Sequence, residues 1–185
     1  MNLPNKITLF RVFLIPVFLI FMFVEAIPFG KWFALGVFII ASLSDMVDGK
    51  IARKYDLVTD FGKFMDPLAD KLLVSSALIA LIQPNRIAAW IVIVIIAREF
   101  IISGFRLIAA DNGIVIAAGW WGKVKTAVTM VMICIVIANL GEDLPAYATG
   151  IHIFEQVLIY LSLALTVISL VDYLVKNKNV IKTYK

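Results

Sequence analysis

Six long runs of apolar residues, separated by short polar turns, constrain the fold of this chain more than any other feature of its sequence. Hydrophobic residues make up 62% of its 185 residues. That share is above what a soluble domain of this size carries, and the mean hydropathy is strongly positive. Runs of this kind are typical of transmembrane helices. The sequence therefore predicts one all-α integral membrane domain over residues 1–185, with six transmembrane helices.

The expected helices follow these runs, with two extensions. The runs 32–43 and 72–82 are each too short to cross about 30 Å of hydrocarbon at about 1.5 Å per residue. Each becomes long enough only if its helix continues through the aspartates beside it. Arg11 interrupts the first run and no signal-peptidase site follows, so we expect a retained first helix. The predicted helices are 7–24, 32–49, 66–82, 87–110, 120–140 and 151–175.

The basic residues are distributed unevenly between the two sides of such a bundle. With the N-terminus inside, only Lys31 and Arg86 lie on the outer side. This is the positive-inside pattern, so we expect both termini in the cytoplasm. The net charge of +4 is explained by these cytoplasmic segments, and we expect membrane lipids rather than a nucleic acid as partners. The same assignment gathers charged side chains from five helices into a polar, metal-containing chamber at the cytoplasmic side.

Two pairs of aspartates lie on the two extended helices, Asp45 with Asp48 and Asp66 with Asp70. Spacings of three and four residues put each pair on one helix face. If the helices lie side by side, each carboxylate contact costs about 3 kcal/mol at about 5–6 Å and an effective dielectric constant near 20. Divalent cations bound by carboxylate oxygens would compensate this charge, and two such ions would bring the site close to neutrality.

Three positions in these segments also have an ordinary structural interpretation. Asp66 precedes Pro67, a combination that is common at a helix start, so on its own Asp66 would be a helix cap. Gly49 would be a helix stop and Gly62 a loop turn. The functional interpretation of the two glycines is that a missing side chain lets the backbone approach a phosphate closely.

The cysteine and histidine content excludes several other chemistries. A single cysteine, Cys134, excludes an internal disulfide, and together with the single histidine, His152, it excludes a zinc site of the usual type. His152 has no second copy of any surrounding motif, so transfer through a phosphohistidine is not expected. Any metal in this chain must therefore be bound by oxygen.

A second group of charged residues lies in the helices 87–110 and 120–140. Arg98 and Glu99 are neighbours in sequence and do not share a helix face, so no simple ion pair between them is expected. Each charge at bilayer depth costs on the order of 3 kcal/mol, which makes the group a candidate for function. A site that holds a metal-bound diphosphate beside a second anion is typical of phosphoryl or phosphatidyl transfer. The basic residues expected to hold the second anion are Arg98, Arg106, Lys123 and Lys125.

The two acidic segments form a single motif: Asp45-x-x-Asp48-Gly49-x-x-Ala52-Arg53, eight residues, then Gly62-x-x-x-Asp66-x-x-x-Asp70. It resembles the defining motif of the CDP-alcohol phosphotransferase family, with every defining residue and the spacing present. Pro4-Asn5-x-x-Thr8-x-x-Arg11 is similar to the N-terminal signature of that family. The segments 98–106 and 122–126 are similar to those of the branch that uses glycerol 3-phosphate.

The resemblance implies a role for each matching residue. The metal ligands would be Asp45, Asp48, Asp66 and Asp70, and Asp70 would also deprotonate the acceptor hydroxyl. The cofactor would be two Mg²⁺ ions, with Mn²⁺ as a substitute. The residues that would contact CDP-diacylglycerol are Asn5, Thr8, Gly49, Arg53, Thr59 and Gly62.

The implied reaction is attack of the 1-hydroxyl of glycerol 3-phosphate on the diacylglycerol-linked phosphorus of CDP-diacylglycerol, with release of CMP. The family is commonly dimeric, so the resemblance also implies a homodimer in the cell membrane, with the active site facing the cytoplasm. Two alternatives remain at this stage. One is another acceptor within the family, such as inositol phosphate, serine or phosphatidylglycerol. The other is a cation-coupled transporter, because paired intramembrane aspartates also mark ion paths.

Overall fold

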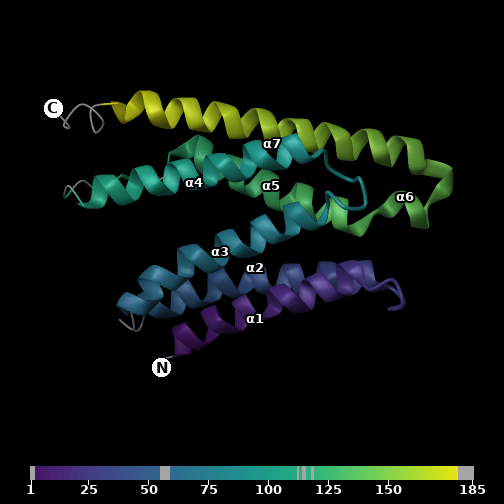
Figure 1. Ribbon diagram of the computed structural model, residues 1–185, viewed down its shortest axis with the longest axis horizontal. Coiled ribbons are helices and arrows are strands. Elements are labelled where there is room, and N and C mark those ends of the chain that lie inside the picture. Colours follow the sequence, from purple (N-terminus) through teal and green to yellow (C-terminus); the bar gives the residue numbers. More distant parts are fainter. Residues whose placement is uncertain (1–2, 55–58, 112, 114–115, 118, 179–185) are drawn as a thin grey trace.

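Six helices of 19 or more residues run side by side in alternating directions in the described part of the chain (Figure 1). The computed structural model describes residues 3–54, 59–111, 113, 116–117 and 119–178, with the backbone alone at 3–4, 45–54, 60–61, 63–64 and 111. The long helices are α1 (Leu3–Phe23), α2 (Gly30–Lys54), α3 (Asp60–Ala80), α4 (Ala89–Asp111), α5 (Trp120–Ala138) and α7 (Ala148–Lys176).

Each long helix corresponds to one predicted apolar run, so the all-α prediction is confirmed. The extensions through the aspartates are also confirmed, because α2 continues to Lys54 and α3 contains both Asp66 and Asp70. Between the predicted helices 120–140 and 151–175, the chain forms the short helices α6 (Leu140–Asp143) and η1 (Pro145–Tyr147). Asn139, with a left-handed φ of 45°, ends α5 and redirects the chain.

The ordinary structural interpretations of Asp66, Gly49 and Gly62 are wrong. Helix α3 begins at Asp60, six positions before Asp66, so Asp66 is not a cap. The cap is Thr59, whose hydroxyl oxygen accepts a hydrogen bond from the Gly62 N–H at 3.1 Å. Gly62 therefore lies in the first turn of α3 and Gly49 lies inside α2, and neither ends a helix.

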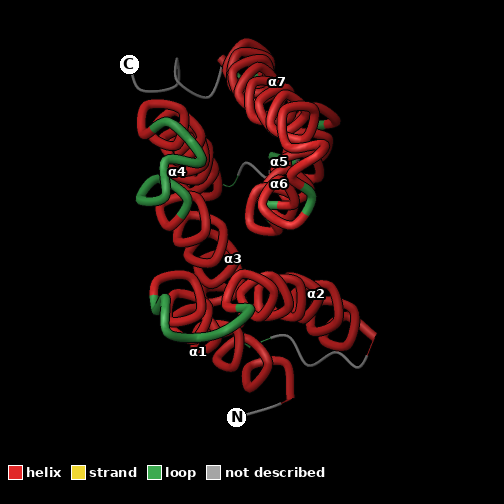
Figure 2. Tube along the Cα trace, turned by 90° about the vertical axis from the view of Figure 1, so that its right-hand side faces the viewer, coloured by secondary structure: helices red, strands yellow, loops and turns green. Residues whose placement is uncertain are grey.

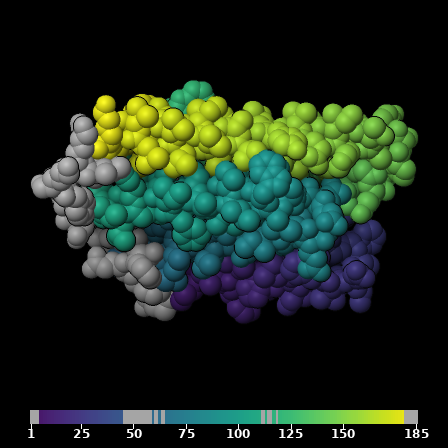
Figure 3. All heavy atoms as spheres, turned by 45° about the horizontal axis from the view of Figure 1, so that its top comes forward, coloured from purple at the N-terminus to yellow at the C-terminus, as the bar shows by residue number. Residues whose placement is uncertain are grey.

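The long helices form two groups of three. Helix α1 packs mainly against α2 and α3, whereas α7 packs against α5 and α4. The two groups are seen one above the other in Figure 2, with α3 between α1 and α4. The groups meet where α2 contacts α5 and where α3 contacts α4 and α5. In the space-filling view, α7 and α4 lie alongside each other through most of the length of the molecule (Figure 3).

The distribution of side chains is that of a membrane protein. Large apolar side chains are exposed along the helices, for example Phe13, Ile93 and Val167, and an exposed apolar surface of this extent requires an apolar environment. Polar side chains lie inside the bundle instead, and buried Thr129 and Ser162 share a hydrogen bond of 2.7 Å between α5 and α7.

Three helical segments are long and apolar enough on their own to cross a membrane: Asn5–Phe23, Trp120–Asp143 and Pro145–Lys176. The apolar part of α2 is shorter, Gly30–Ser44, as expected from the aspartates that follow it. Helices α3 and α4 carry internal charges, which include Asp66 and Asp70 on α3 and Arg98 and Glu99 on α4.

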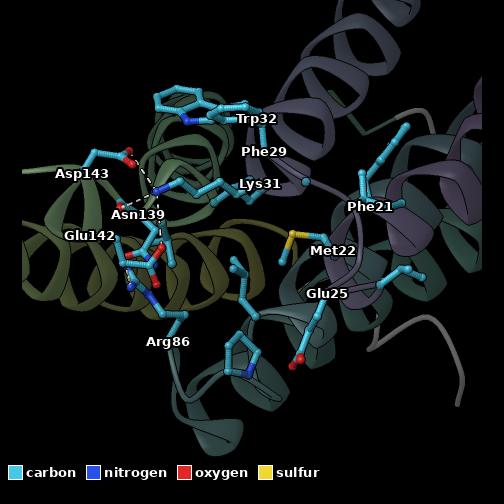
Figure 4. Close-up of a pocket in the computed structure, with 17 residues that line it drawn as sticks. Phe21, Met22, Glu25, Phe29, Lys31, Trp32, Arg86, Asn139, Glu142 and Asp143 are labelled. Atoms are coloured by element: carbon cyan, nitrogen blue, oxygen red, sulfur yellow. Dashed lines mark hydrogen bonds and ion pairs between the residues drawn. The ribbon is translucent and has the colours of Figure 1, made fainter.

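The two chain ends lie at one end of the bundle (Figure 1), and ion-paired residues line a pocket of about 500 Å³ at the other end (Figure 4). There Lys31 of α2 contacts Asp143 at 2.9 Å and Glu142 at 3.3 Å. Arg86, in the turn between α3 and α4, donates to the Asn139 side chain and to Glu155 of α7 at 2.7 Å. These contacts connect the two groups of helices.

Loss of Arg86 is expected to destabilise the protein far more than loss of Lys31. The Glu155 side chain is only 5% exposed, so Arg86→Leu leaves a buried carboxylate without its main partner, at a cost of about 3 kcal/mol. The partners of Lys31 are 66% and 43% exposed, so Lys31→Met should cost at most about 1 kcal/mol. Thermal unfolding in detergent measures the difference. Adding Glu155→Gln should restore most of the stability of Arg86→Leu, and equal losses in the two single variants would contradict this account.

Candidate functional site

A polar cluster joins α1 to the start of α3 at the end of the bundle where the chain termini lie (Figure 1). The fully buried Thr8 hydroxyl donates a hydrogen bond of 2.6 Å to Asp66 Oδ1. Thr59 caps α3 and also donates to the side-chain oxygen of Asn5 at 2.9 Å. Four of the residues predicted from sequence, Asn5, Thr8, Thr59 and Asp66, are therefore brought together. The Thr8 hydrogen bond fixes the orientation of the Asp66 carboxylate.

Gly62 allows this cluster to close. A Cβ atom at this position would lie 3.2 Å from Asn5 Oδ1 and 3.3 Å from Thr59 Oγ1, closer than most real Cβ contacts. Atoms of Asn5 in α1 and of the cap residue Thr59 thus occupy the space that a side chain at position 62 would need. Contact between Gly62 and a phosphate remains a prediction.

Gly62→Ala is expected to reduce activity without the stability gain that alanine normally gives in a helix. Alanine in place of glycine favours a helix by about 1 kcal/mol, but here Asn5 or Thr59 must move to admit the methyl group. We expect an unchanged or lower melting temperature and roughly a tenfold lower turnover. The neighbouring side chain must move by a few tenths of an ångström, and a displacement of about 1 Å at a positioning group costs about 100-fold. The matched control is Gly36→Ala in α2, where a Cβ has no neighbour within 4 Å. Full activity of Gly62→Ala would show that the cluster tolerates the shift.

Asp70 faces the other group of helices, although it lies only four residues after Asp66. It lines a small cavity together with Ser75 of α3, Glu99 of α4 and Lys125 and Thr126 of α5. Asp70 and Lys125 also interact electrostatically. The acidic face of α3 therefore spans the junction between the two groups of helices, with Asp66 on the α1 side and Asp70 on the α4–α5 side.

Glu99 joins two of the four predicted anion-binding residues. Its Oε1 atom accepts a hydrogen bond from Lys125 Nζ at 2.5 Å and another from Arg98 Nη1 at 2.9 Å. Arg98 and Glu99 were not expected to form a simple helical salt bridge because they do not share a helix face, yet the long arginine side chain reaches its neighbour and the two form an ion pair. Arg98 Nε also donates to Ser169 of α7 at 3.2 Å, so one arginine connects two helices.

The other two predicted anion-binding residues lie apart from this pair in the contacts of the described chain. The guanidinium carbon of Arg106 lies 5.6 Å from the centre of the Tyr173 ring, a cation–π contact with α7. Lys123 is exposed near the start of α5. The structure thus brings Arg98 and Lys125 together through Glu99, and Arg106 sits toward α7.

The α2 half of the motif lies outside the described side chains. Helix α2 contains Asp45, Asp48, Gly49 and Arg53, and its continuous backbone keeps both aspartates in the expected helical spacing. Convergence of these two carboxylates with Asp66 and Asp70 stays a prediction.

Sequence reasoning missed the central role of Glu99. The sequence predicts Arg98 and Lys125 as separate anion-binding residues, and it assigns Glu99 no contact with either of them. The available signal was the position of Lys125 within the predicted transmembrane helix 120–140, because a cation inside the bundle requires an anionic partner. In the structure Lys125 is 2% exposed. Ser169 was missed for a different reason, because a serine in an apolar helix has no pattern that marks it as a partner of Arg98.

Comparison with known proteins gives one consistent result. Residues 1–168 match the model of the family described as CDP-alcohol phosphatidyltransferase. The chain is similar to the CDP-diacylglycerol–glycerol-3-phosphate 3-phosphatidyltransferase of Bacillus subtilis, with 44% identity over 98% of each chain. It is 38% identical to the Haemophilus influenzae protein of the same name, over 94% of this chain and 91% of that one. A probable phosphatidylglycerophosphate synthase of Mycobacterium tuberculosis is 36% identical over 95% of this chain and 81% of its own length.

Proposed function

Because the chain belongs to the CDP-alcohol phosphatidyltransferase family, we propose that it transfers the phosphatidyl group of CDP-diacylglycerol to glycerol 3-phosphate. The products are phosphatidylglycerophosphate and CMP, and the reaction is a step of phospholipid synthesis. The observation that carries the choice of acceptor is the 44% identity to a relative of that name over nearly the whole of both chains. Family membership also decides against the cation-coupled transporter.

The acidic residues fit a divalent metal site. The family is generally dependent on divalent metals, and we propose two Mg²⁺ ions, with Mn²⁺ as a substitute. The described donors are carboxylate oxygens, which Mg²⁺ prefers, and Thr8 orients Asp66 in the way that outer hydrogen bonds orient metal ligands. Asp45, Asp48, Asp66 and Asp70 would hold the ions. When bound, they would neutralise the charge of the diphosphate and of the departing CMP.

Asp70 is proposed as the base. The 1-hydroxyl oxygen of glycerol 3-phosphate attacks the diacylglycerol-linked phosphorus, and the bond from that phosphorus to the oxygen of CMP breaks. The hydroxyl proton passes to the Asp70 carboxylate. The cavity that Asp70 shares with Lys125 supports this role, because it places a carboxylate beside a cation that can hold an anionic acceptor.

The acceptor phosphate is proposed to bind at the cations of α4 and α5. Arg98 and Lys125 are almost fully buried and lie on one oxygen of Glu99, so their charges act at nearly the same point. Buried cations interact with a phosphate more strongly than exposed ones, since less water screens them. Arg106 and Lys123 complete the proposed set at the more open side.

CDP-diacylglycerol is proposed to bind at the junction of α1, α2 and α3. Asn5, Thr8, Thr59 and Gly62 lie together beside Asp66, and the motif places Gly49 and Arg53 on the adjoining helix. The acyl chains would then extend into lipid along the exposed apolar faces of the helices.

We further propose that all six long helices span the cell membrane and that the acidic end faces the cytoplasm. The support is the excess of basic residues at the end where both termini lie. The family resemblance supports a homodimer, which light scattering of the detergent-purified protein would test.

The decisive experiment measures CMP release by the purified protein. The protein is incubated with CDP-diacylglycerol and Mg²⁺, and the acceptors glycerol 3-phosphate, inositol phosphate, serine and phosphatidylglycerol are compared. We expect CMP release with glycerol 3-phosphate alone. Release with inositol phosphate but not with glycerol 3-phosphate would overturn the proposed function.

A further inference from the structure

Glu99 uses only one of its two carboxylate oxygens within the described chain. Lys125 Nζ and Arg98 Nη1 both donate to Oε1, at 2.5 and 2.9 Å, and Oε2 has no hydrogen bond to any described residue. The side chains of Lys125 and Arg98 are 2% and 8% exposed, whereas that of Glu99 is 24% exposed. The carboxylate is thus held firmly from one side and remains accessible from the other.

The accessible side of Glu99 is part of the site that holds Asp70. Both side chains line the same small cavity, to which Ser75, Thr126 and Lys125 also contribute. A molecule in this cavity therefore meets two carboxylates and at least one buried cation. One carboxylate is assigned as the base for the attacking hydroxyl, which leaves Glu99 Oε2 as a strong acceptor for a different donor.

We propose that Glu99 determines acceptor specificity by accepting a hydrogen bond from the secondary hydroxyl of the acceptor. This inference rests on the proposed function. Glycerol 3-phosphate carries one phosphate, one primary hydroxyl and one secondary hydroxyl. Arg98 and Lys125 hold the phosphate, Asp70 receives the proton of the primary hydroxyl, and Glu99 Oε2 accepts from the secondary hydroxyl. An alcohol that lacks the secondary hydroxyl leaves this oxygen desolvated without a donor, and is rejected for that reason.

The test compares glycerol 3-phosphate with 3-hydroxypropyl phosphate, which has the same phosphate and primary hydroxyl but no secondary hydroxyl. For the unmodified protein, kcat/KM measured by CMP release should be about 10- to 100-fold higher with glycerol 3-phosphate, the range expected for a hydrogen bond to a charged group. In Glu99→Gln the preference should fall about tenfold, because the amide is a weaker partner for the hydroxyl. Glu99→Asp, which keeps the charge, should retain more of the preference.

The matched control is Glu25→Gln, an exposed residue in the turn between α1 and α2 at the opposite end of the bundle, and its preference should equal that of the unmodified protein. A merely structural role for Glu99 would lower activity with both acceptors equally and leave their ratio unchanged, which would overturn the inference. Lack of preference in the unmodified protein would overturn it regardless of how the variants fold. No CMP release with either acceptor would instead overturn the proposed function, and the inference with it.

Discussion

Replacement of Asp70 by asparagine is expected to reduce CMP release by about 10²- to 10⁴-fold, the range attributed to a positioned general base. Asparagine has nearly the same shape and cannot accept the hydroxyl proton, and it also removes one negative charge from the proposed metal site. Asp70 is half-buried on the continuous helix α3, so the change should leave the helices and their packing intact. Turnover is measured with saturating glycerol 3-phosphate, so that a change in acceptor affinity does not contribute.

The control for this prediction is Asp143→Asn. Asp143 is also a carboxylate near a lysine, but it lies beside Lys31, at the end of the bundle opposite the chain termini. The Asp143→Asn protein should retain nearly full turnover. Melting temperatures and elution volumes of the two variants should match that of the unmodified protein. Turnover of Asp70→Asn within a few fold of normal would exclude Asp70 as the base.

Removal of divalent ions with EDTA is expected to abolish CMP release, and excess Mg²⁺ is expected to restore it. The carboxylates of the motif repel one another without cations, and a diphosphate substrate would add further negative charge. Mn²⁺ should restore activity as well, because it accepts the same oxygen ligands. The measurement is the rate of CMP release at a series of free-metal concentrations.

The end of the bundle opposite the acidic motif provides the reference for this effect. The ion pairs of Lys31 and Arg86 involve no motif residue, so the melting temperature of Arg86→Leu should shift by the same amount with and without EDTA. Undiminished CMP release in EDTA would show that the acidic motif does not act through bound metal.

The helices could be predicted from sequence because their apolar runs are long. The extension of α2 followed from a length requirement, since its apolar part alone cannot cross a bilayer. The start of α3 could not be predicted in this way. Pro67 suggested a start at Asp66, and the actual start depends on the Thr59 hydroxyl, which serves both the helix and Asn5 of α1. Local sequence does not reveal that Thr59 both caps α3 and contacts Asn5 of α1, because Asn5 is distant in the chain.

The candidate site was predictable where a spaced motif exists and unpredictable where partners come from different helices. The i, i+4 spacing of Asp66 and Asp70 predicted that they share one helix. It could not predict that Asp66 faces α1 whereas Asp70 faces α4 and α5. Glu99 illustrates the remaining limit. Its partners are its sequence neighbour Arg98 and Lys125, 26 positions later, and side-chain length rather than helical periodicity decides both contacts.

The ion pair between Glu99 and Lys125 has a consequence for the biogenesis of the protein. Moved into the bilayer on α5 alone, the Lys125 charge would cost on the order of 3 kcal/mol, whereas contact with Glu99 of α4 compensates it. Helix α4 leaves the ribosome before α5, so Glu99 is already available when the lysine emerges. If both helices span the membrane as proposed, they are expected to enter it together as a hairpin, with α4 inserted stably only once α5 has been synthesised.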